Sequence, residues 1–185
     1  MFKKIIFILK NRFLNKSKIS LYAFIKNPKN ITIEQNVEVH SNSSIDAAKG
    51  KITLKNNTIL NRYSYLNAGK GSIIIGEGSE INNFTVINGM GDVIIGKNVL
   101  IGPNVQIIPY NHNFMDKKVY IKKQGITHNK IVIEDDVWIG ASSIILAGVT
   151  IKKGSVVACG SIVNKDTLEY SINIGSPSKF YKERK

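Results

Sequence analysis

The chain has 185 residues, of which 43% are apolar, and its 26 Lys and Arg against 13 Asp and Glu give a formal net charge of +13. This length predicts one domain, or one domain with a small appendage, and the apolar content excludes a disordered chain. The single cysteine, Cys159, excludes a disulfide framework and a cysteine-rich zinc module.

Residues 1–30 form a basic amphipathic N-terminal segment that contains cations and no acidic residue. On a helix, five apolar side chains of this segment would share one face; they are Phe2, Ile5, Ile6, Leu9 and Phe13. We expect such a helix to cover the end of the domain or to pack on a partner subunit. The alternative is peripheral contact of residues 1–26 with an anionic membrane surface.

The early apolar run, residues 5–9, is too short for a membrane span or an ordinary signal peptide. We therefore expect a soluble cytoplasmic protein, with the inner face of the membrane as the alternative location. The excess of positive charge is confined to the two ends of the chain, and the central part has no basic helix or stacking motif. We therefore expect no nucleic-acid partner.

A six-residue repeat begins at Ile33, and an aliphatic residue leads each hexad. The 18 leads are Ile33, Val39, Ile45, Leu54, Leu60, Leu66, Ile75, Ile81, Ile87, Ile95, Ile101, Ile107, Ile133, Ile139, Ile145, Ile151, Val157 and Val163. The fifth residue of the hexad is Ser, Thr or Val in 14 of the 18. The hexads group into triplets, and one triplet is followed by a 20-residue insertion.

Three short strands joined by tight corners make one coil of a three-sided parallel β-solenoid, in which the leads of successive coils stack. The pattern predicts an all-β chain with about six coils over residues 31–170, interrupted by an inserted loop at about 108–131. A small helical tail is expected over residues 171–185. Gly and Asn directly after the leads, such as Gly102 and Gly140, are expected to adopt positive φ at the corners. The usual rule for parallel crossovers would make the solenoid right-handed.

The hexad resembles that of the hexapeptide-repeat acyltransferases over residues 31–185. The most specific segments are Ile101-Gly102-Pro103-Asn104-Val105, Asn111-His112, Asp136-Val137-Trp138-Ile139-Gly140, Val163-Asn164-Lys165-Asp166 and the closing Ile174-Gly175-Ser176-Pro177-Ser178-Lys179. This combination is similar to the branch of maltose, galactoside and polysaccharide O-acetyltransferases. The resemblance implies a left-handed β-helix, assembly as a homotrimer, and acetyl-CoA as the acyl donor. Asn164, Cys159 and residues 167–169 depart from the usual pattern of the family.

The activity that the resemblance implies is acetyl transfer to a sugar hydroxyl, in surface polysaccharide or lipopolysaccharide biosynthesis. Histidine suits the role of general base because its unperturbed pKa of about 6.5 lies near working pH. His112 follows the Pro-Asn-Val valine, Val105, by seven residues, which is the place of the catalytic base in the family. We expect His40 and His128 to be ordinary surface residues.

The resemblance also implies roles for residues around the base. Asn83 and Trp138 would contact the acceptor, although corner packing is an equal alternative for Trp138. Three residues would line the coenzyme groove, with the Ala141 backbone N–H as a candidate oxyanion donor; they are Ala141, Cys159 and Gly160. Three lysines would meet the coenzyme phosphates, unless they form only a solvated basic tail; they are Lys165, Lys179 and Lys182.

Other functions remain open at this point. The same fold could acetylate the amine of an amino-sugar nucleotide, or it could be a non-catalytic solenoid that binds a glycan or a membrane. A three-histidine zinc site, as in carbonic anhydrases of the gamma class, would require convergent ligands. His40 and His112 lie three coils apart, roughly 14 Å at a strand spacing of about 4.8 Å. We therefore expect no metal.

Overall fold

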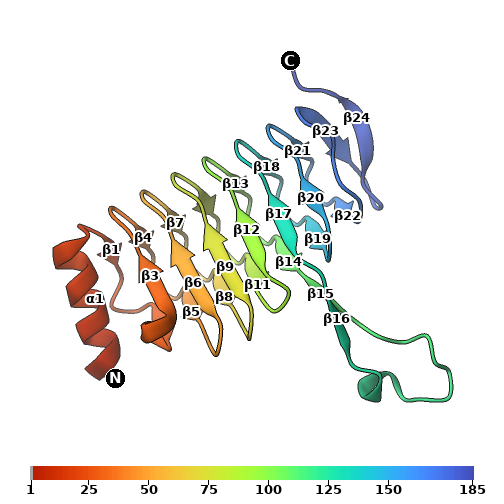
Figure 1. Cartoon of the computed structure of the whole chain (residues 1–185). Helices are drawn as coiled ribbons and strands as arrows, with labels where there is room; N and C mark the ends of the chain where they lie inside the picture. The colour runs from red at the N-terminus through yellow and green to blue at the C-terminus, as the bar shows by residue number, and fades with distance from the viewer. Residues whose placement is uncertain (1) are drawn as a thin grey trace.

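The computed structural model describes residues 2–185, except for the side chain of Phe2. It shows a three-sided parallel β-helix (Figure 1). Sheet A contains, in spatial order, β1 (Lys18–Ile19), β4 (Glu38–Val39), β7 (Ile59–Leu60), β10 (Glu80–Ile81), β13 (Leu100–Ile101), β18 (Trp138–Ile139), β21 (Val156–Val157), β23 (Ser171–Ile174) and β24 (Lys179–Glu183). Sheet B contains β2 (Phe24–Lys26), β5 (Ser44–Asp46), β8 (Tyr65–Asn67), β11 (Val86–Asn88), β14 (Gln106–Ile108), β19 (Ile144–Leu146) and β22 (Ile162–Val163). Sheet C contains β3 (Ile31–Ile33), β6 (Lys51–Leu54), β9 (Ser72–Ile75), β12 (Val93–Ile95), β17 (Ile131–Ile133) and β20 (Thr150–Ile151).

The hexad leads form the interior of the solenoid, as predicted. All 18 are buried, and Ile33, the most exposed of them, has only 4% of its surface accessible. Leads of successive turns are direct partners in the parallel ladders; Ile95, for example, pairs with Ile75 on one side and Ile133 on the other. Stacked apolar leads therefore provide the continuous core that no single turn could bury alone.

The small fifth residues of the hexads are buried at the corners, and their hydroxyls satisfy backbone groups there. All 14 Ser, Thr and Val residues predicted at this position are buried. The Thr85 hydroxyl donates to the carbonyl oxygen of Gly102 (2.8 Å) and accepts a hydrogen bond from the backbone N–H of Val105 (3.2 Å). A short hydroxyl side chain thus satisfies polar backbone that a tight corner would otherwise leave unpaired.

The prediction of positive φ directly after the leads is wrong. Positive φ falls two residues later, at the fourth hexad position, where Asn36, Asn57 and Asn98 are typical occupants. Glycines directly after the leads serve close approach of the next turn instead. A Cβ atom on Gly140 would lie 2.5 Å from the backbone nitrogen of Cys159, far inside van der Waals contact.

The solenoid begins at Lys18 and not at residue 31, so residues 1–30 are not a segment separate from the β-helix. Strands β1 and β2 add a first turn, and sheet B accordingly has seven strands where six coils were predicted. Ile19 and Ile25 are six residues apart and are both buried leads. The repeat is obscured because Ala23 takes the fifth position and the short 3-10 helix η1 (Pro28–Asn30) interrupts the third side.

Helix α1 (Phe2–Leu14) covers the N-terminal end of the solenoid (Figure 1). The completely buried Ile8 packs against the core, and polar side chains of the helix region bind carbonyl groups of the first turns. The Arg12 Nε donates to the carbonyl oxygen of Ile19 (2.9 Å), and the Lys4 ammonium donates to that of Leu21 (3.0 Å). Covering an open strand edge in this way prevents pairing with other chains.

The predicted apolar face of α1 is not the face that packs on the solenoid. Ile5, Ile6, Leu9 and Phe13 are 38 to 86% exposed, whereas Ile8 is buried. No helix within residues 2–185 combines the length and apolar character that a membrane span needs.

The C-terminal segment is extended, so the predicted helical tail is wrong. Strand β24 pairs antiparallel with β23, the last parallel strand of sheet A. Phe180 and Tyr181 lie in β24, and aromatic residues favour strands. Pairing with the terminal edge of the sheet therefore decides the structure of this segment.

Ile8 and Leu9 provide a matched test of the helical cap. Ile8→Asp should lower the free energy of unfolding by roughly 3 kcal/mol or more, because it places an unpaired charge in the core. Leu9→Asp, at a side chain that is 53% exposed, should change it by less than about 0.5 kcal/mol. Urea unfolding followed by circular dichroism measures both, and equal losses would show that α1 does not cap the solenoid.

Candidate active site

The corner between sheets A and B carries most of the predicted site residues. At this corner the third residues of successive hexads form a column, which we call the A/B corner. Its members are Leu21, Ser41, Arg62, Asn83, Pro103, Ala141 and Cys159. Backbone hydrogen bonds join successive turns of the column, as from Asn104 N–H to the Asn83 carbonyl (2.9 Å) and from Gly160 N–H to the Ala141 carbonyl (2.8 Å). The fold therefore aligns Asn83, Ala141, Cys159 and Gly160 along one edge of the molecule.

The backbone N–H of Ala141 is available as a hydrogen-bond donor. Within residues 2–185 it donates to no protein acceptor, whereas the Ala141 carbonyl is bonded. The preceding turn leaves room at this point because Gly102 has no side chain; a Cβ there would lie 2.8 Å from the Ala141 nitrogen. An unpaired, fixed backbone N–H at a corner is the kind of donor that can stabilise a developing oxyanion.

Trp138 lies on the outer face of sheet A, three residues before Ala141. It pairs with Leu100 on one side and Val156 on the other, and half of its surface (50%) is exposed. In the isolated chain the indole is therefore not a corner-packing residue. It forms, with the exposed Leu100, an apolar surface beside the A/B corner.

His112 lies on an arm that leaves the solenoid. Residues 109–130 depart after β14 and return at β17, and β15 (Tyr110–His112) pairs antiparallel with β16 (Ile126–His128) (Figure 1). The Asn113 side chain orders the arm beyond the histidine: it donates to the Gln124 carbonyl (3.0 Å) and accepts a hydrogen bond from the Thr127 hydroxyl (2.7 Å). His112 is consequently exposed on a structured hairpin.

A single chain does not bring His112 together with the other predicted residues. The arm leaves at the end of the sheet-B strand β14, whereas Asn83 and Ala141 lie at the A/B corner, before the sheet-B strands begin. The base and the oxyanion donor are thus at opposite ends of one side of the triangle. A site that uses both must combine two copies of the chain.

Two of the three predicted phosphate-binding lysines share a recess at the C-terminal end. Lys165 and Lys179 line a cavity of about 250 Å³ together with Asp166 and Phe180. Lys182 does not line it; its ammonium lies 5.4 Å from the ring centroid of Tyr181. Lys182 therefore lies outside the recess that Lys165 and Lys179 share.

The remaining histidines have neighbours of their own. His40 Nε2 lies 3.5 Å from a carboxylate oxygen of Glu38, and the ring of His128 stands edge-on to that of Tyr110 with centroids 6.3 Å apart. Among residues 2–185, no group of three or more His, Cys, Asp or Glu side chains is arranged to hold a metal ion.

Sequence reasoning missed an aromatic pair at the A/B corner. Tyr63 and Phe84 stack with ring centroids 5.0 Å apart and an interplanar angle of 5°, and both are at least half exposed. Each has a φ of 60°, a conformation that is rare for bulky residues. The signal was present in the repeat, because these aromatics occupy the fourth hexad position, where Asn or Gly is usual.

Comparison with known proteins agrees with this architecture. The family profile described as bacterial transferase hexapeptide (six repeats) matches residues 130–165. Galactoside O-acetyltransferase of Lactococcus lactis is 39% identical over 87 residues, which cover 46% of this chain and 41% of that enzyme. The matched segment thus spans about four tenths of the length of this relative.

Two solved structures resemble larger parts of the chain. A hexapeptide-repeat acetyltransferase of Vibrio cholerae, solved with acetyl-coenzyme A, is 32% identical with a TM-score of 0.64, and the match covers 74% of this chain and 72% of that one. The N-acyltransferase AntD of Bacillus cereus is 23% identical with a TM-score of 0.60, and the match covers 90% of this chain and 80% of AntD. AntD therefore shares the fold of this chain. The chain belongs to the hexapeptide-repeat acyltransferase family.

Proposed function

We propose that the protein is an acetyl-CoA-dependent O-acetyltransferase that acts on a hydroxyl of a sugar or glycan. The observation that carries this proposal is the exposed His112 on an ordered arm, in a chain whose A/B corner presents the unpaired N–H of Ala141. The identity to a galactoside O-acetyltransferase supports a sugar hydroxyl as acceptor. We place the activity in surface polysaccharide or lipopolysaccharide biosynthesis, in the cytoplasm.

The roles of the residues follow from the chemistry of acetyl transfer. Acetyl-CoA, when bound, supplies a thioester carbonyl that a hydroxyl oxygen can attack. His112 would accept the proton of that hydroxyl, and the Ala141 N–H would donate to the carbonyl oxygen as negative charge develops on it. As the new C–O bond forms, the C–S bond of the thioester would break, and the departing CoA thiolate would take the proton back from His112 and leave as the free thiol. Gly160 suits the coenzyme groove because a Cβ atom there would meet no atom within 4 Å, so the corner is open.

The arm also supports assembly as a homotrimer. Phe114, Met115, Tyr120 and Ile121 are 57 to 87% exposed on it, which is an unusual amount of apolar surface for an isolated chain. Packing the arm against a neighbouring copy would bury these side chains. It would also carry His112 to the A/B corner of that copy, where Asn83 and Ala141 lie.

His112→Ala should reduce turnover by about 10²–10⁴, the usual contribution of a positioned general base. His128→Ala is the matched control on the same hairpin and should cost less than about tenfold, because His128 lies across from Tyr110 rather than beside His112. Acetyl-CoA consumption with galactoside, maltose and an amino-sugar nucleotide as acceptors measures both variants. Similar losses of turnover in the two variants would contradict the assignment of His112 as the general base. Transfer of acetyl only to the amino sugar would show that the enzyme is an N-acetyltransferase and not an O-acetyltransferase.

The lysines provide a second test, this time of the coenzyme groove. Lys165→Ala and Lys179→Ala should each raise the KM for acetyl-CoA several-fold and leave kcat nearly unchanged, because phosphate contacts lie far from the reacting carbonyl. Lys182→Ala should have a smaller effect, since Lys182 lies outside the recess. The effect should shrink at high salt. A larger change for Lys182→Ala than for the other two would show that this recess does not hold the phosphates.

A further inference from the structure

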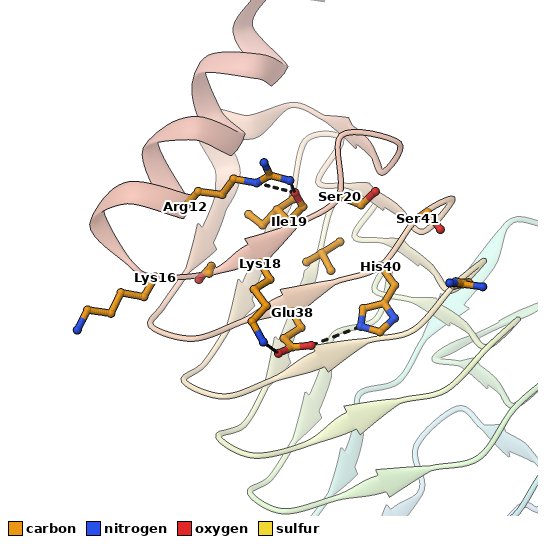
Figure 2. A pocket seen from close by; sticks show the side chains of 11 residues that line it. Arg12, Lys16, Lys18, Ile19, Ser20, Glu38, His40 and Ser41 are labelled. Carbon is orange, nitrogen blue, oxygen red and sulfur yellow. Dashed lines mark hydrogen bonds and ion pairs between the residues drawn. The ribbon is translucent and has the colours of Figure 1, made fainter.

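A large recess lies between α1 and the outer face of sheet A (Figure 2). Its volume is about 590 Å³. The ionisable side chains around it come from α1 and the residues that follow it, from β4 and the residue after it, from β1, and from the A/B corner. They are Arg12, Lys16, Lys18, Glu38, His40 and Arg62.

Positive charge dominates this recess, because the one carboxylate is already engaged. Glu38 accepts a hydrogen bond from the Lys18 ammonium (2.7 Å), as Figure 2 shows, and this contact lowers the pKa of Glu38 below its ordinary value. Glu38 therefore stays ionised and balances Lys18. The charges of Arg12, Lys16 and Arg62 have no counter-ion within residues 2–185.

The three uncompensated cations differ in whether their side chains already form hydrogen bonds within the protein. Arg12 donates to the carbonyl of Ile19, so part of its guanidinium is committed to the helical cap. The side chains of Lys16 and Arg62 make no hydrogen bond or ion pair within the described chain and are exposed. Lys16 extends outward from the rim of the recess (Figure 2). A guanidinium and an ammonium with free N–H groups are suited to phosphate oxygens.

The recess is in line with the proposed site along the A/B corner. Arg62 precedes Asn83 by one turn and Ala141 by three, which is roughly 14 Å at about 4.8 Å per turn. The stacked Tyr63 and Phe84 follow Arg62 and Asn83 directly and lie between the recess and Ala141 along this edge. An apolar aromatic surface beside polar corner residues suits a sugar ring or a nucleobase.

We propose that this recess binds the diphosphate of an acceptor in which a sugar is linked to a phosphate ester, and that the sugar extends over the Tyr63–Phe84 pair toward Ala141. The inference rests on the proposed acetyltransferase function for the direction of the sugar, but diphosphate binding is independent of catalysis. Two free cations, Lys16 and Arg62, together with the partly engaged Arg12, match the charge of a diphosphate better than that of a single carboxylate.

Two kinds of molecule carry this diphosphate. One is a nucleotide-linked sugar, whose base would add stacking. The other is a lipid-linked sugar diphosphate, which would place α1 at a membrane surface. In that case the exposed Ile6, Leu9 and Phe13 of α1 would face the lipid.

The test is calorimetric titration of the full-length protein with inorganic pyrophosphate, uridine diphosphate and farnesyl diphosphate. The double variant Lys16→Asn/Arg62→Gln should weaken binding of each probe by roughly tenfold or more. Asn is chosen because Lys16 has a φ of 52°, which Asn tolerates. The control Lys51→Gln/Lys70→Gln removes the same charge from exposed side chains outside the recess, and it should change affinity by less than about twofold.

Several outcomes would overturn the proposal: absence of pyrophosphate binding to the wild type, equal weakening in both double variants, or no weakening in the recess variant.

Because acetyl-CoA itself contains a diphosphate, its affinity is measured on the same variants and should remain unchanged. A loss of acetyl-CoA affinity alone would assign the recess to the coenzyme. Tighter binding of uridine diphosphate than of pyrophosphate identifies the nucleotide source, and tighter binding of farnesyl diphosphate identifies the lipid source. His112→Ala should leave all these affinities unchanged. Loss of activity in this variant therefore tests the catalytic proposal, whereas the titrations test diphosphate binding.

Discussion

The structure depends on the in-register stacking of aliphatic leads from one turn to the next. Because each lead pairs with the lead of the next turn, every other hexad position is also stacked, and residues with the same position in the hexad form columns along the outside. The A/B corner is such a column. Chemical groups on it are separated by multiples of about 4.8 Å, which places Arg62, Asn83 and Ala141 on one line without any specific contact between them. The same constraint forces insertions to leave at corners, which is where the arm with His112 departs.

Most of the solenoid could be predicted from sequence, because a buried lead every six residues is a strong and repeated signal. What failed was decided by contacts that the repeat does not encode. The buried face of α1 depends on which helical residues contact the first turn of the solenoid. Ile8 contacts it and is buried, whereas the equally apolar Leu9 is exposed. The first turn was missed because Ala23 breaks the fifth-position pattern. The C-terminal strand forms because the last edge of sheet A is available for pairing, a property of the assembled sheet and not of residues 179–183.

The candidate site was predicted in a similar, partial way. Family resemblance pointed to Asn83, Ala141, Cys159 and Gly160, and the fold does align them on one corner. It did not indicate that Lys182 lies outside the recess that Lys165 and Lys179 share, which depends on the course of β24. The Tyr63–Phe84 pair was overlooked although bulky residues at an Asn or Gly position are a visible anomaly. The cationic recess depends on α1 lying over β1, and no local pattern in the sequence contains that information.

We propose that catalysis combines His112 of one copy with the A/B corner of a neighbouring copy. Complementation between two inactive variants tests it most directly: His112→Ala provides an intact corner, and Ala141→Pro, which removes the donor N–H, provides an intact arm. When the two are unfolded together in equal amounts and reassembled, roughly one quarter of the interfaces in a closed ring should regain both intact halves, and acetyl transfer should return in that proportion. Each variant reassembled alone should remain inactive. Reassembled mixtures that form trimers but show no activity above the separate variants would contradict the account and place the complete site within one chain.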